Sequence, residues 1–216
     1  MAAETALERF WREMRDGIQF LRGRPNLILL GASWALFLGA MMTGVVVTAP
    51  LSDQVFHAGA VGYGWLNAGW GSGAFFSALY APWFIAKFSA RRSVAISMGL
   101  LAICMTVAPL APVLALAVVV YGGMGSARGL TGVAINTSLM EQVPQHFMGR
   151  VQNTFYFAGT GLQIVLALCA GLIAHRVSLT AAFALLGLVY VLAFIGSVWP
   201  VPVTSRTSDA VAVAAE

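Results

Sequence analysis

The sequence predicts an all-α membrane protein with six transmembrane helices. Of its 216 residues, 59% are hydrophobic and only 9% are charged, whereas a soluble domain carries about 25% charged residues. Uncharged apolar runs recur between residues 26 and 199, each near the ~20 residues that cross ~30 Å of hydrocarbon. The stretch 185–195 is apolar on every face, which excludes the alternating pattern of a membrane β-barrel.

The chain divides into three expected parts. In residues 1–25 apolar and charged side chains interleave, a pattern typical of an amphipathic helix on a membrane surface, although a simple basic cytoplasmic anchor explains them equally well. Residues 26–200 form the bundle, which Pro25 opens, and residues 201–216 are expected to be a disordered cytoplasmic tail. The six predicted spans are 26–48, 61–86, 94–111, 113–139, 154–174 and 179–199.

The basic residues predict the orientation of the chain. Ten of the twelve lysines and arginines precede the first span or follow the second, fourth and sixth. The opposite loops hold only Arg176, and Arg128 lies within a span. Because cytoplasmic loops carry such an excess of Lys and Arg, we expect both termini of the chain to lie in the cytoplasm. The net charge of +4 thus gives no reason to expect a nucleic-acid partner.

A weak internal repeat relates the first three spans to the last three. In the second span Tyr63 precedes Gly69 and Gly71, and in the fifth Tyr156 precedes Gly159 and Gly161. This predicts a three-plus-three inverted repeat, as found in transporter halves. The third and sixth spans are almost wholly apolar and suit lipid, whereas the other four carry the polar residues expected at helix contacts or a cavity.

Arg128 is the strongest candidate for a functional residue. A charge near the middle of a span costs at least ~2.5 kcal/mol and marks function by default. Thr131 and Gly132 follow one helical turn later, which predicts a polar cavity there. On this interpretation Arg128 anchors an anionic substrate group or a charge on another helix; alternatively, it caps backbone carbonyls or extends towards one surface.

Two further helices carry a polar or glycine-rich face. The fifth span has a stripe at helical spacing, formed by Asn153, Tyr156, Thr160 and Gln163, which either lines a translocation path or joins helices. Close approach to a partner is favoured for Asn67, Gly69, Gly71 and Gly73 in the second span and for Gly159 and Gly161 in the fifth.

The loops predicted to be cytoplasmic hold a candidate gate formed by Arg91, Arg92, Glu141 and Arg150. An ion pair from Glu141 to one of the three arginines, closing in only one conformational state, would act as a gate. Anchoring to the cytoplasmic side accounts for the arginines but leaves Glu141 unexplained.

Several short motifs occur in a characteristic order. They are Asp16-Gly17 to Pro25 before the first span, Gly62-Tyr63-Gly64 with glycines at 69, 71 and 73, Ala90-Arg91-Arg92, Val143-Pro144, and Gly149-Arg150-Val151. In these the chain resembles the second six-helix half of a bacterial drug or siderophore exporter of the major facilitator superfamily. The resemblance implies that the first and fourth spans line a central cavity, that the second and fifth meet another half, and that the third and sixth face lipid. The family's loop motif G-x-x-x-D-R-x-G-R-R is degenerate here, since it keeps only Arg91 and Arg92 and has Lys87 in place of the Asp.

The resemblance implies one half of a secondary active transporter that moves a small molecule across the bacterial inner membrane by alternating access, as an exporter. The expected partners are the lipid bilayer, a small-molecule substrate and a second half, either a separate chain or another copy. A non-transporting scaffold or a truncated fragment is the alternative. An intramembrane hydrolase using Ser33 and His175 is disfavoured, because these residues fall at opposite membrane surfaces. Without a P-loop, a dinucleotide fingerprint or a metal-spaced cluster, we expect no enzyme and no cofactor.

Overall fold

The computed structural model describes residues 6–199. The predicted tail at 201–216, with Arg206, lies outside the described residues. The described chain is built from helices and turns: α1 (Ala6–Leu21), α2 (Pro25–Pro50), a π-helical turn η1 (Leu51–Val55), α3 (Gly59–Phe88), α4 (Ala90–Val107), a 3₁₀ turn η2 (Ala108–Leu110), α5 (Leu114–Gln142), α6 (Gln145–Arg176) and α7 (Leu179–Val198). The prediction of an all-α fold is confirmed.

Local sequence explains several of the helix boundaries. Pro25 occupies the first turn of α2, where its missing N–H costs nothing. Ser89 separates α3 from α4 with a φ of 71°, a value that interrupts a right-handed helix. Pro144 forces α5 to end before it. The hydroxyl of Ser178 accepts a hydrogen bond of 3.1 Å from the backbone N–H of Ala181 and so caps the start of α7.

Five helical stretches are long and apolar enough to cross a membrane within the described chain, namely Pro25–Val55, Ala90–Leu110, Leu114–Gln142, Gln145–Arg176 and Leu179–Val198. The remaining predicted span, 61–86, falls on α3, which is not among these five stretches because its glycines and polar residues make it less apolar. With 30 residues, α3 extends about 45 Å. It therefore has the length to span the membrane beside α5, against which it packs.

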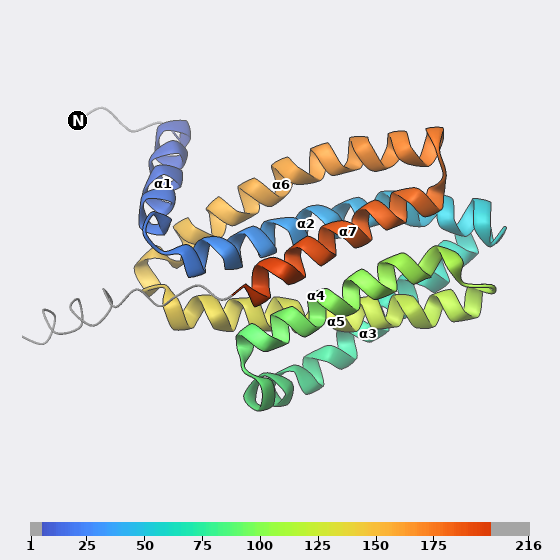
Figure 1. Cartoon of the computed structure of the whole chain (residues 1–216), viewed down its shortest axis with the longest axis horizontal. Helices are drawn as coiled ribbons and strands as arrows, with labels where there is room; N and C mark the ends of the chain where they lie inside the picture. The colour runs from blue at the N-terminus through green and yellow to red at the C-terminus, as the bar shows by residue number, and fades with distance from the viewer. Residues whose placement is uncertain (1–5, 200–216) are drawn as a thin grey trace, which may run out of the picture.

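The packing of the helices repeats the predicted three-plus-three symmetry. In Figure 1 the long helices run side by side, and α2 packs mainly on α6 and α7. Its counterpart in the second half, α5, packs mainly on α3 and α4, which are the counterparts of α6 and α7. The helices α4 and α7 pack on each other, so exchanging the two halves leaves the pattern of contacts unchanged. This is the arrangement of a transporter half-bundle.

A seam of small residues joins α3 to α5. The buried positions of α3 are Gly62, Leu66, Gly69, Gly73, Ser77 and Ala81, spaced mostly four residues apart. A β-carbon on Gly69 would collide with the carbonyl of Val118, and one on Gly73 with the carbonyl of Gly122. The two backbones thus approach as closely as in small-xxx-small membrane helix pairs.

The helix α1 lies across one end of the bundle, where the described chain begins and ends (Figure 1). It is docked on the start of α6: Asp16 forms an ion pair of 3.3 Å with Arg150, and the ring of Phe20 stacks on that of Phe147 with centres 4.7 Å apart. The exposed side chains of Trp11 and Ile18 are apolar. The segment is therefore an ordered amphipathic helix over residues 6–21.

Candidate functional site

Arg128 is the middle residue of the 29-residue helix α5. Its Nε–H donates to the sulfur of Met41 on α2 at 3.3 Å, and its guanidinium carbon lies 4.8 Å from the centre of the Trp70 ring on α3. Within residues 6–199, no carboxylate lies within ion-pair distance of Arg128. The cation is therefore positioned by a thioether and an aromatic face, and it is not neutralised.

Two hollows meet at Arg128. The smaller, about 80 Å³, extends between α2, α3, α4, α5 and α7 and is lined by Thr48, Trp70 and Tyr121 among others. The larger, about 290 Å³, lies between α2, α5 and α6 and is lined by Trp34, Phe37, Leu38, Met41, Gly129, Gly132, Val133, Asn136 and Tyr156 beside Arg128 itself. A membrane-spanning helix thus presents a charge to a hollow on either side.

Two residues of the larger hollow had no part in the sequence prediction. The indole of Trp34 is buried, and its Nε1–H has no acceptor among the described residues. The amide of Asn136 is fixed at both ends, since its nitrogen donates to the carbonyl of Gly132 at 2.8 Å and its oxygen accepts from Gln152 on α6 at 3.0 Å. The spacing Arg128, Gly132, Asn136 in steps of four is the sequence signal that would have identified Asn136.

Thr131 lies on a different face of α5 from the hollow. Its side chain is fully buried, and its hydroxyl donates to the Ser97 hydroxyl at 2.7 Å and to the carbonyl of Ala127 at 2.9 Å. It therefore joins α5 to α4. Thr131 was expected to share the cavity with Arg128, but in this structure it does not line the hollow. Three residues along a helix leave two side chains about 60° apart around the axis, and this turns Thr131 towards α4.

The polar stripe of α6 is brought only partly into the site. Tyr156 lines the larger hollow and meets Trp34 edge to face, with ring centres 5.8 Å apart. Asn153 and Thr160 are exposed, and Gln163 is half-buried, and none of the three lines that hollow. Much of the face of α6 that carries this stripe is therefore not covered by other described helices.

The glycines predicted to pack fall into two groups. Gly69 and Gly73 pack on α5, and Gly159 packs on Leu38 of α2. A β-carbon on Gly71 or Gly161 would meet nothing within 4 Å. Asn67 is exposed, donates to the carbonyl of Tyr63 at 2.9 Å and lines the smaller hollow. Close helix contact is thus made inside this bundle at three of the five glycines, and it is available to a partner only at the other two.

Comparison with known families identifies the bundle. The model of the Major Facilitator Superfamily matches residues 5–214, which is nearly the whole chain. The chain belongs to the major facilitator superfamily. The predicted family is therefore confirmed at the level of the superfamily. No curated protein and no solved structure matches the chain significantly.

The superfamily loop motif lies where α3 passes into α4. Lys87 places its Nζ 5.1 Å from the centre of the Trp83 ring and 5.5 Å from that of Phe88, so it is held by aromatic faces on its own helix. Arg91 donates from Nε to the carbonyl of Ser197 at 3.1 Å and from a terminal nitrogen to the carbonyl of Trp199. Arg91 therefore satisfies carbonyls at the end of α7 that no later turn of helix can reach.

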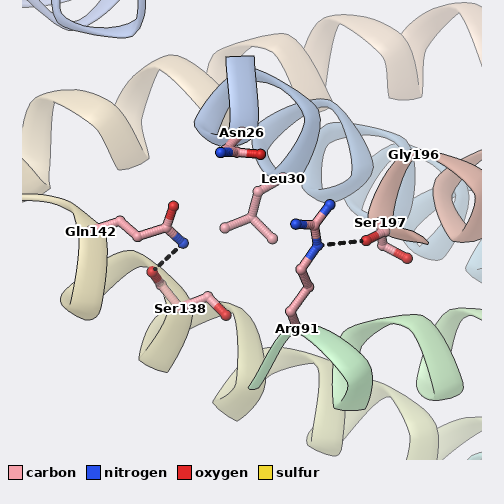
Figure 2. Close-up of a pocket in the computed structure, with 7 residues that line it drawn as sticks. All are labelled: Asn26, Leu30, Arg91, Ser138, Gln142, Gly196 and Ser197. Atoms are coloured by element: carbon pink, nitrogen blue, oxygen red, sulfur yellow. Dashed lines mark hydrogen bonds between the residues drawn. The ribbon is translucent and has the colours of Figure 1, made fainter. Parts of the chain in front are cut away.

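A third hollow, of about 110 Å³, opens beside Arg91. Figure 2 shows Arg91 extending to Ser197 across the hollow from Gln142, which donates to the carbonyl of Ser138 at 3.0 Å. The side-chain oxygen of Asn26 also lines it and is buried without a donor among the described residues. Four helices, α2, α4, α5 and α7, meet here at the end where basic residues gather.

The four residues of the candidate gate are not paired with one another in this conformation. Arg150 pairs with Asp16 and Arg91 with the end of α7. Arg92 and Glu141 are exposed, and no ion pair joins them to each other or to the other two within the described part of the chain. No pattern in the sequence predicts that Arg150 pairs with α1 and that Arg91 bonds to α7.

Proposed function

We propose that the chain is one half of a secondary active transporter that moves a small molecule across a bacterial inner membrane by alternating access, with both termini in the cytoplasm. Membership of the superfamily supports a transport function. Export is the direction favoured by the resemblance to bacterial drug exporters in Gly62-Tyr63-Gly64 and Arg91-Arg92.

The observation that carries this proposal is the environment of Arg128. A structural arginine of a membrane helix caps carbonyls or extends to a surface, but Arg128 donates to no described carbonyl and sits in the middle of its helix. It lines two hollows instead. A charge kept at that depth without a counter-ion is expected where a transported group supplies the missing partner.

The test is transport by reconstituted protein, normalised to the amount of folded protein. Arg128→Met removes the charge and keeps apolar bulk, so folding should survive while transport falls by about tenfold or more. Arg128→Lys should restore only part of the rate, because lysine lacks the planar fork. If Arg128→Met lowers thermal stability but leaves normalised transport unchanged, Arg128 is structural and the proposal fails.

The alternative function is a non-transporting scaffold or a truncated transporter. It is favoured by the position of the acidic residues: in the described membrane-spanning stretches Asp53 and Glu141 lie only at the ends, and no acidic residue lies in the central part. Proton-coupled transport generally needs such a carboxylate. If transport is coupled to protons, a second half must supply this carboxylate.

We propose that this second half is a separate chain or another copy. The open positions Gly71 and Gly161 and the exposed stripe of α6 support a partner on the faces of α3 and α6 that this bundle leaves bare. Extraction in mild detergent should give a dimer or a complex. A monomer that transports at full rate in liposomes would contradict this part of the proposal.

A further inference from the structure

We infer that the ligand of the larger hollow is an organic anion with an aromatic or otherwise apolar body, its acidic group held at Arg128. This inference rests on the proposed function and names the class of its substrate. It follows from three properties of the hollow between α2, α5 and α6: the sign of its charge, the chemistry of its walls and the space beside Gly132.

Apart from the hydroxyl of Tyr156, which can do either, the polar side chains of the hollow offer protons rather than accept them. Only the Nε–H of Arg128 is engaged, by Met41, and the terminal N–H groups have no acceptor within residues 6–199. The buried Nε1–H of Trp34 is also without an acceptor there, and the oxygen of Asn136 is already taken by Gln152. No Asp or Glu is among the lining residues. A carboxylate, sulfonate or phosphate would satisfy these donors, whereas a cation would meet an unpaired positive charge.

The walls of the hollow are apolar and aromatic. Trp34, Phe37 and Tyr156 face the hollow with Leu38 and Val133, and Trp34 meets Tyr156 edge to face. The volume of about 290 Å³ is at the lower end of the range of roughly 300–1,000 Å³ for small-molecule pockets. A free inorganic anion would leave these rings uncovered, so the ligand is expected to have an apolar part.

The smaller hollow is a poorer site for the acidic group. Two of its four hydroxyls satisfy each other, since Thr48 and Tyr121 are hydrogen-bonded at 3.0 Å, and it offers only about 80 Å³. The face of Trp70 covers the guanidinium from α3. The buried indole N–H of Trp34, which has no acceptor among the described residues, lies on the other side, in the hollow between α2, α5 and α6.

Gly132 allows the hollow to be filled without disturbing the fold. It lines the larger hollow, and a β-carbon added there would meet nothing within 4 Å. Gly132→Leu should therefore place a side chain in the ligand's volume. Gly171→Leu is the matched control, because Gly171 also lies within a long helix, is equally open and lies outside the hollow.

The test measures equilibrium binding of three probes to the full chain in nanodiscs of phosphatidylcholine, with empty nanodiscs subtracted. The probes share one ring system: 2-naphthoate, 2-naphthalenemethanol and 2-naphthylmethylammonium. We expect 2-naphthoate to bind about tenfold or more tightly than the alcohol, as one charge-assisted hydrogen bond provides, and the ammonium to bind least. Arg128→Met should remove the preference for naphthoate over the alcohol. Gly132→Leu should remove binding of both naphthoate and the alcohol, and Gly171→Leu should change neither the preference nor the binding.

Equal binding of naphthoate and alcohol, tighter binding of the ammonium, or a naphthoate preference that survives Arg128→Met would overturn the inference. So would displacement of naphthoate by phosphatidylglycerol added to the nanodiscs, which would assign the hollow to an anionic lipid. These outcomes are separate from failure of the proposed function. Transport that depends on Arg128 but prefers a neutral or cationic substrate contradicts the inference alone, and anion binding without any transport by the assembled protein contradicts the function alone.

Discussion

The guanidinium carbon of Arg128 on α5 lies 4.8 Å from the centre of the Trp70 ring on α3. A cation over an aromatic face gains up to about 2 kcal/mol when it is shielded from water. Because no described carboxylate neutralises Arg128, the ring is its main electrostatic partner in this conformation.

Replacement of Trp70 should therefore destabilise the bundle through Arg128. We expect Trp70→Leu to lower the free energy of unfolding by about 2 kcal/mol from the lost ring contact and to cost clearly less when Arg128 is already Met. A double-mutant cycle in thermal unfolding measures the difference. Trp65→Leu is the control, since Trp65 is on the same helix and 60% exposed; equal costs with and without Arg128 would mean that Trp70 acts only through packing.

The seam between α3 and α5 predicts that two glycines separated by a single residue respond in opposite ways. Gly73→Val should abolish folding or lower expression severely, because its β-carbon would collide with the backbone carbonyl of Gly122 and push the helices apart. Gly71→Val should be tolerated, since that position is open. Yield of monodisperse protein and thermal midpoint check both, and tolerance of Gly73→Val would show that α3 and α5 are not in backbone contact.

The two adjacent arginines at the start of α4 should differ in their effect on α7. Arg91→Gln removes hydrogen bonds to the carbonyls of Ser197 and Trp199, so the last turn of α7 should fray at a cost of about 0.5–1.5 kcal/mol. Arg92→Gln is the matched control, since Arg92 is exposed and bonds to neither carbonyl. Faster hydrogen exchange confined to the end of α7 in the first variant is the expected result; the same change in both would remove the assigned role of Arg91.

The distribution of basic residues predicts which end of the bundle faces the cytoplasm. In a background without Cys104 and Cys169, a cysteine at the exposed position Ser89 should react with an impermeant label only from the cytoplasmic side. A cysteine at Gln54, exposed in the turn at the opposite end, should react only from outside. Reaction of both from one side would refute the six-span topology.

The sequence by itself determined the fold class, the order of the helices and the family. Apolar runs longer than a bilayer is thick leave helices as the only way to satisfy the backbone, and Pro25, Ser89 and Pro144 interrupt them where the described helices begin or end. Four of the six predicted spans were shorter than the helices, most clearly that of α6, which begins at Gln145 rather than 154, because a helix extends beyond the hydrocarbon into residues that carry no apolar signal.

The tertiary structure decided which polar residues meet. Thr131 and Asn136 follow Arg128 on the same helix, but only Asn136 shares its hollow, whereas Thr131 contacts α4. The positions of the neighbouring helices decide which face of α5 lines a hollow and which is packed. Likewise Asp16, rather than Glu141, pairs with Arg150. Residues 134 positions apart in the chain become neighbours when α1 docks on α6, and no local pattern of charge encodes that contact.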